Sequence, residues 1–439
     1  MRRVVGLLWL LALVAVSCSI PERSVEELGL PPAEDESSGG ESPEEDGSGD
    51  DAEDDTPEAT PIIDFSGAIA IGGPQGLVIA EPNGEAIVEP DEPPGVATQP
   101  TWSRDGERAA AFIPTVSGGS VIIVSEDETV VAEATRPYFF FSWSGDGQYL
   151  AALGPGPQGT SLDVLDQQGQ RVSTSSFDAG SLFLAWEPNG QSLVLHGDDA
   201  LWLVDDPTDL AAAVSLGEPG QFFTAPAWIP ATREVIIVDE ADDGRLVRLD
   251  VDTQTRIDLG PVGYDAGFVV SPDGSRLFLT HAGPNLEFSD DITVSYSQPT
   301  QILGDVLSEV LFLDSGQRVI INYQPTWWAE WSPNAESVLM LQPGTERPSW
   351  RLISADGMID LGEAELSDTF AANYVLFAWQ YVESPRLWSP NSNAFVYGAQ
   401  DAVGPGIVVH QLGSGPSRIA DGDVAFWAPE LPASAPVPT

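Results

Sequence analysis

Residues 101–112 read TWSRDGERAAAF, and related stretches follow throughout the rest of the chain. The later copies are SWSGDGQYLAAL (142–153), AWEPNGQSLVLH (185–196), AWIPATREVIIV (227–238), VVSPDGSRLFLT (269–280), EWSPNAESVLML (330–341), LWSPNSNAFVYG (387–398) and the truncated FWAPE (426–430). Their equivalent positions are Trp102, Trp143, Trp186, Trp228, Val270, Trp331, Trp388 and Trp427, with steps of 41, 43, 42, 42, 61, 57 and 39 residues. Since a period of about 40 to 45 residues with several strands per unit is typical of a propeller blade, we expect an all-β β-propeller.

Each part of this repeat has a physical role. Asp-Gly or Asn-Gly between two apolar segments predicts a two-residue hairpin turn, because both residues tolerate the positive φ that such turns require. The tryptophan before the turn is large enough to fill the space between neighbouring sheets. We therefore interpret the repeated tryptophans as core residues. After the turn, runs such as 235–238 (VIIV) suit strands that are covered on both faces.

The two ends of the repeat predict how the ring closes. Only twelve residues follow Trp427, which is too few for the remaining strands of a blade. Three strand-like segments without a tryptophan, 68–73, 76–84 and 85–90, precede the first copy. We expect the strand around 424–427 to pair with them, which removes exposed sheet edges and gives eight four-stranded blades. Seven blades is the alternative, if one long interval hides a degenerate boundary. The propeller should span 62–430, followed by a disordered tail at 431–439.

The amino-terminal residues have the pattern of an export signal. Arg2 and Arg3 precede the apolar run 4–16, and Cys18, the single cysteine, follows it. This arrangement resembles a bacterial lipobox, in which the cysteine is lipidated and becomes the first residue of the mature chain. We expect a signal peptide at 1–17 and a lipoprotein at the cell or outer membrane, with the propeller outside the cytoplasm. An ordinary cleaved signal with an incidental cysteine, or a short uncleaved anchor, is the alternative.

Residues 18–61 are rich in carboxylates, Gly, Ser and Pro and hold few apolar side chains, so we expect a disordered tether. Residues 65–439 contain 51 of the 68 acids and 14 of the 17 basic residues, all of them Arg, for a net charge of −37. This balance argues against nucleic acid as a partner and against a membrane contact other than the lipid anchor. A solubility adaptation accounts for the acidity. Calcium is the alternative, although 250–253 (DVDT) reads as an ordinary turn and no EF-hand loop is present.

Two intervals between copies are longer than the others. The extra residues are 281–305 and 362–384, and insertions in repeat proteins map to loops that often form a binding face. In the second insertion, apolar side chains at helical spacing predict a short amphipathic helix that either covers the end of the propeller channel or binds a partner. The candidate binding surface comprises Trp327, Trp328, Phe370, Tyr374, Trp379 and Tyr381.

Few residues suggest catalysis. The three histidines, His196, His281 and His410, belong to different blades, and no Gly-x-Ser-x-Gly motif occurs. Since Cys18 is the only thiol, a cysteine nucleophile within the propeller is excluded. We expect neither catalytic residues nor a metal site nor a cofactor. Paired carboxylates in the channel remain an alternative, because sequence does not show which acids have altered pKa values.

The copies resemble the WD40-like PD40 repeat of TolB-type propellers, whose pattern is Trp-Ser-Pro-Asp-Gly. The nearest matches are 331–334 (WSPN), 388–391 (WSPN) and 271–274 (SPDG), and the resemblance covers residues 65–430. It implies the propeller fold and leaves function open, because one fold supports many functions. The α/β domain that precedes the TolB propeller is replaced here by the acidic tether.

Two functions fit these patterns. The first is a non-enzymatic binding module, held at the envelope by its lipid and presenting one face to an envelope protein, a peptide or a glycan. The second is a propeller hydrolase or lyase that uses channel carboxylates with a divalent cation. The sequence favours the binding module.

Overall fold

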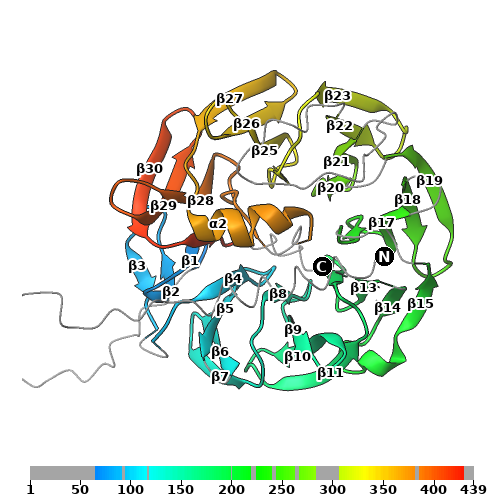
Figure 1. Cartoon of the computed structure of the whole chain (residues 1–439), viewed down its shortest axis with the longest axis horizontal. Coiled ribbons are helices and arrows are strands. Elements are labelled where there is room, and N and C mark those ends of the chain that lie inside the picture. Colours follow the sequence, from blue (N-terminus) through cyan, green and yellow to red (C-terminus); the bar gives the residue numbers. More distant parts are fainter. Residues whose placement is uncertain are drawn as a thin grey trace, which may run out of the picture. The chain divides into compact units, whose positions relative to one another are not determined.

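The propeller is a closed ring of eight blades (Figure 1). The computed structural model describes residues 65–90, 94–115, 118–198, 200–218, 224–239, 244–262, 266–282, 306–380 and 385–429. The predictions for the signal peptide, Cys18, the tether and the tail lie outside these residues. The expectation of an all-β propeller with eight blades is confirmed. Among the described residues, no helix has the length and apolar character needed to cross a membrane.

The strands follow the repeat closely. Blade 1 contains β4 (Thr98–Trp102), β5 (Arg108–Thr115), β6 (Gly118–Ser125) and β7 (Thr129–Ala134), and blade 2 contains β8 (Phe140–Trp143), β9 (Tyr149–Gly156), β10 (Gly159–Asp166) and β11 (Arg171–Phe177). Blade 3 contains β12 (Leu182–Trp186), β13 (Leu193–Gly197), β14 (Leu201–Val204), the short helix η3 (Leu210–Ala212) and β15 (Val214–Gly217). Blade 4 contains β16 (Ala227–Trp228), β17 (Glu234–Asp239), β18 (Arg245–Asp250) and β19 (Arg256–Pro261).

The later blades repeat this order from the centre outward. Blade 5 contains β20 (Gly267–Val270), β21 (Arg276–Ala282), β22 (Val306–Phe312) and β23 (Arg318–Asn322), and blade 6 contains β24 (Trp328–Trp331), β25 (Ser337–Pro343), β26 (Pro348–Ser354) and β27 (Gly357–Glu363). Blade 7 contains β28 (Ala394–Gln400), β29 (Pro405–Gln411) and β30 (Gly415–Asp421). An isolated bridge between Trp388 and Phe395 takes the place of its inner strand.

The two ends of the propeller share blade 8. Its order is β3 (Ala86–Val88), β2 (Gly76–Ala80), β1 (Ile69–Gly73) and β31 (Val424–Trp427), so the last strand of the chain is its innermost strand. The register pairs Ile69 with Trp427 and Gly72 with Val424. This pairing is the predicted closure, and it joins the two ends of the propeller within one sheet by backbone hydrogen bonds.

The turn inside the repeat differs from the predicted two-residue hairpin. In the first copy, Gly106 N–H donates to Ser103 O at 3.0 Å and Ser103 N–H donates to Arg108 O at 2.8 Å, which leaves four residues in the loop. Gly106 has a φ of 72°, whereas Asp105 is absent from the residues with positive φ. Asp105 instead accepts a 2.5 Å hydrogen bond from the Ser103 hydroxyl. The prediction was wrong because the acid serves as a side-chain acceptor here and does not occupy the left-handed region.

The repeated tryptophans are buried, as predicted, and most of them also tie neighbouring blades together. Trp186 Nε1 donates to Ser142 O at 3.1 Å, and Ser142 comes directly before the tryptophan of the preceding blade. The same bond recurs from Trp102, Trp228, Trp331 and Trp388 to the carbonyls of Phe426, Ala185, Val269 and Glu330. Trp427 donates instead to Gly67 O. Trp143 Nε1 is buried without a partner within the described residues.

This contrast gives a matched test of the bond between blades. We expect Trp186→Phe to lower the free energy of unfolding by about 1 to 2 kcal/mol more than Trp143→Phe, because only the first change leaves a buried carbonyl without its donor. Chemical denaturation of the two variants and the unchanged protein measures the difference. Equal losses for the two variants would show that the indole donor contributes nothing beyond its packing.

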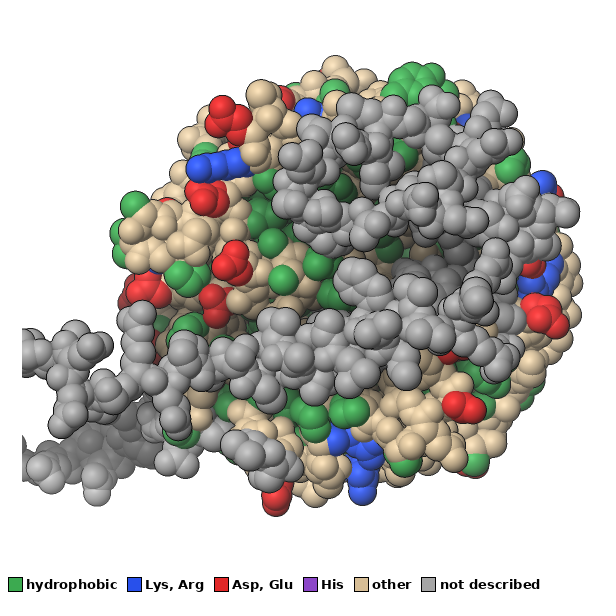
Figure 2. Space-filling model, in the orientation of Figure 1, with side chains coloured by type: hydrophobic (Ala, Val, Ile, Leu, Met, Phe, Trp, Pro, Cys, Tyr) green, Lys and Arg blue, Asp and Glu red, His purple; other side chains and the backbone are tan. Residues whose placement is uncertain are grey.

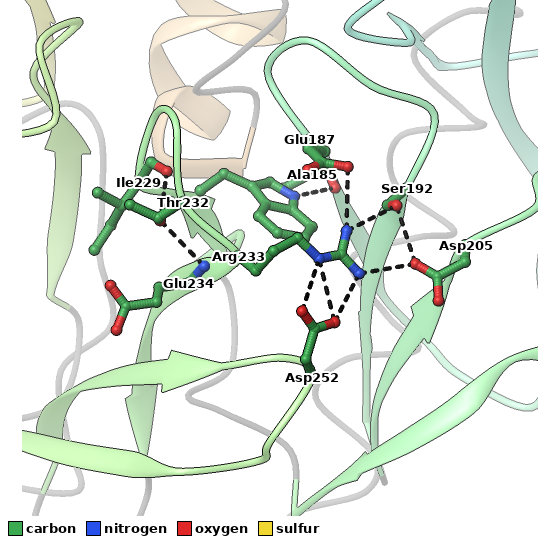
Figure 3. A network of polar contacts seen from close by, with 10 residues as sticks. Ala185, Glu187, Ser192, Asp205, Ile229, Thr232, Arg233, Glu234 and Asp252 are labelled. Carbon is green, nitrogen blue, oxygen red and sulfur yellow. Dashed lines mark hydrogen bonds and ion pairs between the residues drawn. The ribbon is translucent and has the colours of Figure 1, made fainter.

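Arg233 joins blades 3 and 4 at the face that carries the turns of the repeat (Figure 3). Its guanidinium donates to Glu187 Oε2 at 3.2 Å and to Asp205 Oδ1 at 3.0 Å in blade 3, and to Asp252 Oδ1 at 3.1 Å in blade 4. It also lies 5.6 Å from the centre of the Trp228 ring. One planar cation thus bridges three carboxylates, which a compact ammonium group does less well.

Removal of the Arg233 guanidinium should lower the free energy of unfolding. We expect Arg233→Ala to destabilise the propeller by about 1 to 3 kcal/mol, because three acids would be left without their shared counter-ion, whereas Arg108→Ala should cost less than about 1 kcal/mol. Arg108 is the control because, within the part of the chain that the structure describes, it forms a salt bridge with exposed Glu107 alone. Denaturation at low and high salt should give a smaller difference at high salt. An Arg233→Ala loss no larger than that of the control would contradict the network's role.

Candidate functional site

Both long insertions leave the ring on the same face. Antiparallel strands alternate in direction, so the turn between the first and second strands of a blade lies at one end, and the connection to the next blade starts at the other end. The first insertion separates β21 from β22, the second and third strands of blade 5, and the second insertion follows β27, the last strand of blade 6. We call this side the insertion face.

Residues 366–380 form a cap segment on the insertion face, which contains the predicted short helix. Helix α2 (Asp368–Asn373) begins after Ser367, whose hydroxyl accepts from Phe370 N–H at 3.1 Å, and Asp368 in the first turn suits the positive end of the helix dipole. The short helix η6 (Val375–Gln380) follows. The Ser367 hydroxyl also donates to Asp423 O at 2.6 Å, which fixes the start of α2 beside blade 8.

The cap segment contacts six of the eight blades. Leu366 forms a bridge with Ala399 in blade 7, and Tyr374 Oη accepts from Gln99 N–H of blade 1 at 3.1 Å. The ring centres of Tyr374 and Phe426 in blade 8 are 5.2 Å apart, and those of Phe370 and Trp328 in blade 6 are 5.8 Å apart.

Trp379 makes the two remaining contacts. Its carbonyl accepts from Ala225 N–H, just before β16 of blade 4, at 3.0 Å. Its ring lies against Gly267 in blade 5, where a Cβ atom would come within 2.2 Å of the indole, so only glycine fits there. In Figure 1 the helix crosses the middle of the ring, which agrees with these contacts. The cap segment therefore covers the centre of the ring on the insertion face.

The structure divides the predicted binding residues into two groups. Phe370 and Tyr374 of the cap segment are buried together with Trp328 beneath it, whereas Trp327 and Trp379 are partly exposed. Tyr381 lies outside the described residues. A partner on this face would thus reach Trp327 and Trp379 first, with the other three aromatics as their support. The binding surface itself stays a prediction.

The three histidines lie apart in the fold, and each contacts other groups of the core. His196 Nδ1 lies 3.1 Å from Thr224 O, and His410 stacks on Phe395 with ring centres 4.9 Å apart. His281 Nε2 donates to Glu309 Oε1 at 3.0 Å. In the described ranges, no three His, Cys, Asp or Glu side chains are grouped as metal ligands would be. The expectation of no metal or cofactor stays a prediction. Asp250 forms the expected turn by accepting from Asp252 and Thr253 N–H.

The sequence did not single out Glu309, which is almost fully buried. Besides His281, Arg318 donates to its Oε1 at 2.7 Å. Burial opposes ionisation, but the hydrogen bonds from His281 and the charge of Arg318 outweigh it and hold the pKa of Glu309 below its usual value. Arg318 also donates to Leu259 O at 2.8 Å and thereby joins blade 5 to blade 4. Glu309 therefore anchors a contact between blades.

A second set of buried polar side chains joins blades 5 and 6, and we call it the polar seam. Ser308 and Thr326 hydroxyls are 2.8 Å apart, and Gln342 Nε2 donates to Thr326 Oγ1 at 2.8 Å. Asn322 Nδ2 donates to Gln342 Oε1 at 3.0 Å, and Arg351 donates to the same oxygen at 2.8 Å. A fully hydrogen-bonded buried network fixes one arrangement of its elements. The seam therefore ties the outer strand of blade 5, β23, to β25 and β26 of blade 6.

Among the described carboxylates, Glu330 has the pKa that is raised most above its usual value. It lies on β24, and its Oε2 accepts from Leu387 N–H of blade 7 at 2.9 Å. Desolvation raises the pKa of Glu330 to about 7, in spite of this hydrogen bond and the charge of Arg386, which both lower it. Glu330 sits where blade 7 has only a bridge in place of an inner strand, so its hydrogen bond to Leu387 lies at the join between blades 6 and 7.

Comparison with known proteins supports the fold and nothing finer. No protein-family model and no curated protein matches the chain. Among solved structures, a eukaryotic initiation factor matches with a TM-score of 0.55 and 12% identity, over 83% of this chain and 98% of that chain. The dihydro-heme d1 dehydrogenase NirN matches with a TM-score of 0.53 and 12% identity, over 83% of this chain and 75% of that one. TolB from Acinetobacter baumannii matches with a TM-score of 0.40 and 14% identity, over 73% and 82% of the two chains. At such identities the initiation factor and NirN matches show the propeller fold alone.

The raised pKa of Glu330 predicts a pH-dependent stability. Because the native state holds this proton more tightly than the unfolded chain, the stabilisation is complete below about pH 4.5 and is lost as the pH rises through about 7. We expect Glu330→Gln to remove about 2 to 3 kcal/mol of that pH dependence from the free energy of unfolding. Glu336→Gln, which changes an exposed acid of the same blade, is the control. Parallel pH profiles for the unchanged protein and Glu330→Gln would contradict the assignment.

Proposed function

We propose that the chain is an exported, lipid-anchored propeller that binds an envelope protein, peptide or glycan through its insertion face and catalyses no reaction. One observation carries this proposal. The cap segment fills the centre of that face with aromatic side chains, and Trp327 and Trp379 stay partly exposed above the buried ones. Large aromatic side chains held rigid by packing are the residues that supply most of the affinity in binding surfaces.

The engagement of the buried carboxylates also favours binding over catalysis. Asp163 accepts from Tyr138 Oη at 2.8 Å and lies 3.1 Å from Arg136 Nε. Glu309 is held by His281 and Arg318. Acids with these partners neutralise arginines inside the fold. The sequence supports the location, because Cys18 follows an apolar export segment and the acidic residues up to 61 would hold the propeller away from the membrane.

Capture from an envelope extract tests the insertion face. The full chain in detergent serves as bait, beside a Trp379→Ala variant and a Trp202→Ala control. Trp202 is a matched residue, because it is also partly exposed and also packs on a glycine, Gly197, but it belongs to blade 3. We expect the unchanged protein and the control to retain the same partner and Trp379→Ala to lose it, with an affinity at least about tenfold lower, as for a central aromatic contact.

Thermal unfolding separates loss of binding from loss of folding. The comparison counts only if Trp379→Ala and Trp202→Ala unfold in one cooperative step with midpoints well above the assay temperature. Equal retention by Trp379→Ala and the unchanged protein would remove Trp379 from the binding surface. Equal loss in the two tryptophan variants would show that the effect is general and not a property of this face.

A further inference from the structure

A small recess opens at the junction of blades 2 and 3. Its volume is about 190 Å³. Pockets for drug-sized ligands have volumes of roughly 300 to 1,000 Å³, so this recess suits a single small ring. Six side chains line it, namely Gln148, Tyr149, Asp166, Gln167, Gln168 and Gln191. We call it the glutamine recess.

Three turns of the chain bring these side chains together. Gln148 and Tyr149 lie at the start of β9, and Gln167 and Gln168 lie in the turn between β10 and β11. Gln191 comes from the turn between β12 and β13 of blade 3, which is adjacent to blade 2 (Figure 1). Since antiparallel strands alternate in direction, all three turns lie at the same end of the blades. The glutamine recess therefore lies on the face opposite the insertion face.

Tyr149 departs from the pattern of the repeat. It stands six positions after Trp143, and the residues at the same position in the other full copies are Arg108, Ser192, Glu234, Arg276, Ser337 and Ala394. Because those blades fold in the same way with small or charged residues there, the fold does not require an aromatic side chain at this position. The ring of Tyr149 packs on the core between blades 2 and 3 and stays partly exposed. Its position is thus fixed while part of it is accessible to a ligand.

Hydrogen bonds hold two of the amides in place. Gln191 Nε2 donates to Asp146 Oδ2 at 2.7 Å, and Gln167 Nε2 donates to Gly147 O at 3.1 Å. The Ser144 hydroxyl fixes Asp146 in turn by donating to its Oδ1 at 2.7 Å. Among the described residues, neither amide oxygen accepts a hydrogen bond, so each can accept one from a ligand. Because these groups are already ordered, a ligand loses less entropy on binding them.

The lining favours a neutral ligand that is rich in hydroxyl groups. Four of the six side chains are amides, which offer donors and an acceptor, as a hydroxyl group does. None of the six is basic, residues 65–439 have a net charge of −37, and Figure 2 shows acidic side chains spread around the rim, so an anion would be repelled. The one carboxylate, Asp166, accepts through Oδ1 from Gln168 and Gln170 N–H. A divalent cation usually has several carboxylates around it.

We infer that the glutamine recess binds one neutral sugar ring, with the apolar face of the sugar on Tyr149 and its hydroxyl groups on Gln167 and Gln191. Tyrosine suits such a ligand, because it has an apolar ring and a polar hydroxyl. The exposed Gln148 and Gln168 leave the recess open, so the ring can be a free sugar or one unit of a glycan. This site uses no residue of the insertion face, so failure of one proposal leaves the other standing.

Saturation-transfer NMR tests the inference, with the full chain in a detergent that has no sugar headgroup. The probes are the methyl glycosides of glucose, galactose, mannose and N-acetylglucosamine, and glucuronate and glucosamine are the charged controls. We expect at least one neutral glycoside to bind with a millimolar dissociation constant, because a single ring makes few contacts. Both charged sugars should bind at least about tenfold more weakly. Competition by a trisaccharide of the bound sugar would indicate a glycan, and its exclusion a free sugar, and either result supports a sugar site.

Protein variants locate the site. Tyr149→Ser introduces the residue that blades 3 and 6 have at this position, so folding should be retained, and it should weaken sugar binding at least about tenfold. Gln170→Ala, which changes a glutamine of the same turn outside the lining, should leave binding unchanged, as should Trp379→Ala on the insertion face. The inference fails if no neutral glycoside binds or if a charged sugar binds equally well. It also fails if Tyr149→Ser binds as the unchanged protein does.

Discussion

The hydrogen bond that five of the repeated indoles donate to the carbonyl before the equivalent position of the preceding blade is the constraint on which the ring depends. It joins the inner strands of successive blades, and it fixes the position of one blade relative to the next because both atoms are buried. Trp102 makes the same bond to Phe426 across the point where the chain ends meet. The strand exchange in blade 8 is thus reinforced by a side-chain bond, and the ring closes through two kinds of contact.

Where this bond is missing, polar side chains join the blades. Blade 5 has Val270 in place of a tryptophan, and there Arg318 donates to Leu259 and Pro261 carbonyls of blade 4 while its charge is balanced by Glu309. Trp143 lacks an acceptor among the described residues, and Asp163 holds Arg136 and Tyr138 at the connection between blades 1 and 2. Buried ions are costly unless they are paired. At these two joins they connect the blades where the repeated bond is absent, whereas the Arg233 network adds to that bond between blades 3 and 4.

The fold could be predicted because its signal is repeated and local. The spacing of the tryptophans, the turn residues and the strand-like segments at both ends require no knowledge of distant contacts, so the eight blades and their closure followed from them. The turn geometry was wrong, since whether Asp105 adopts positive φ depends on the hydroxyl of Ser103. The candidate site could be predicted less well from the sequence. Which aromatics of the cap segment are buried depends on contacts with six different blades, and these contacts are distant in sequence. Glu330 and the polar seam gave no sequence signal, because their partners come from neighbouring blades.

The negative charge of the propeller limits the kinds of partner that its surface can bind. All cations of the propeller are arginines, and many of the described ones reach carboxylates of the fold, as Arg233 does with three acids. The surface therefore offers few positive groups and a field of one sign, which repels acidic partners and attracts basic ones. Against that background, the binding proposed for the insertion face depends on partly exposed aromatics and not on charge. Salt screens attraction between exposed charges and leaves apolar burial intact. Binding at the insertion face should therefore weaken little as the ionic strength rises, whereas a basic partner held only by the acidic surface should be released.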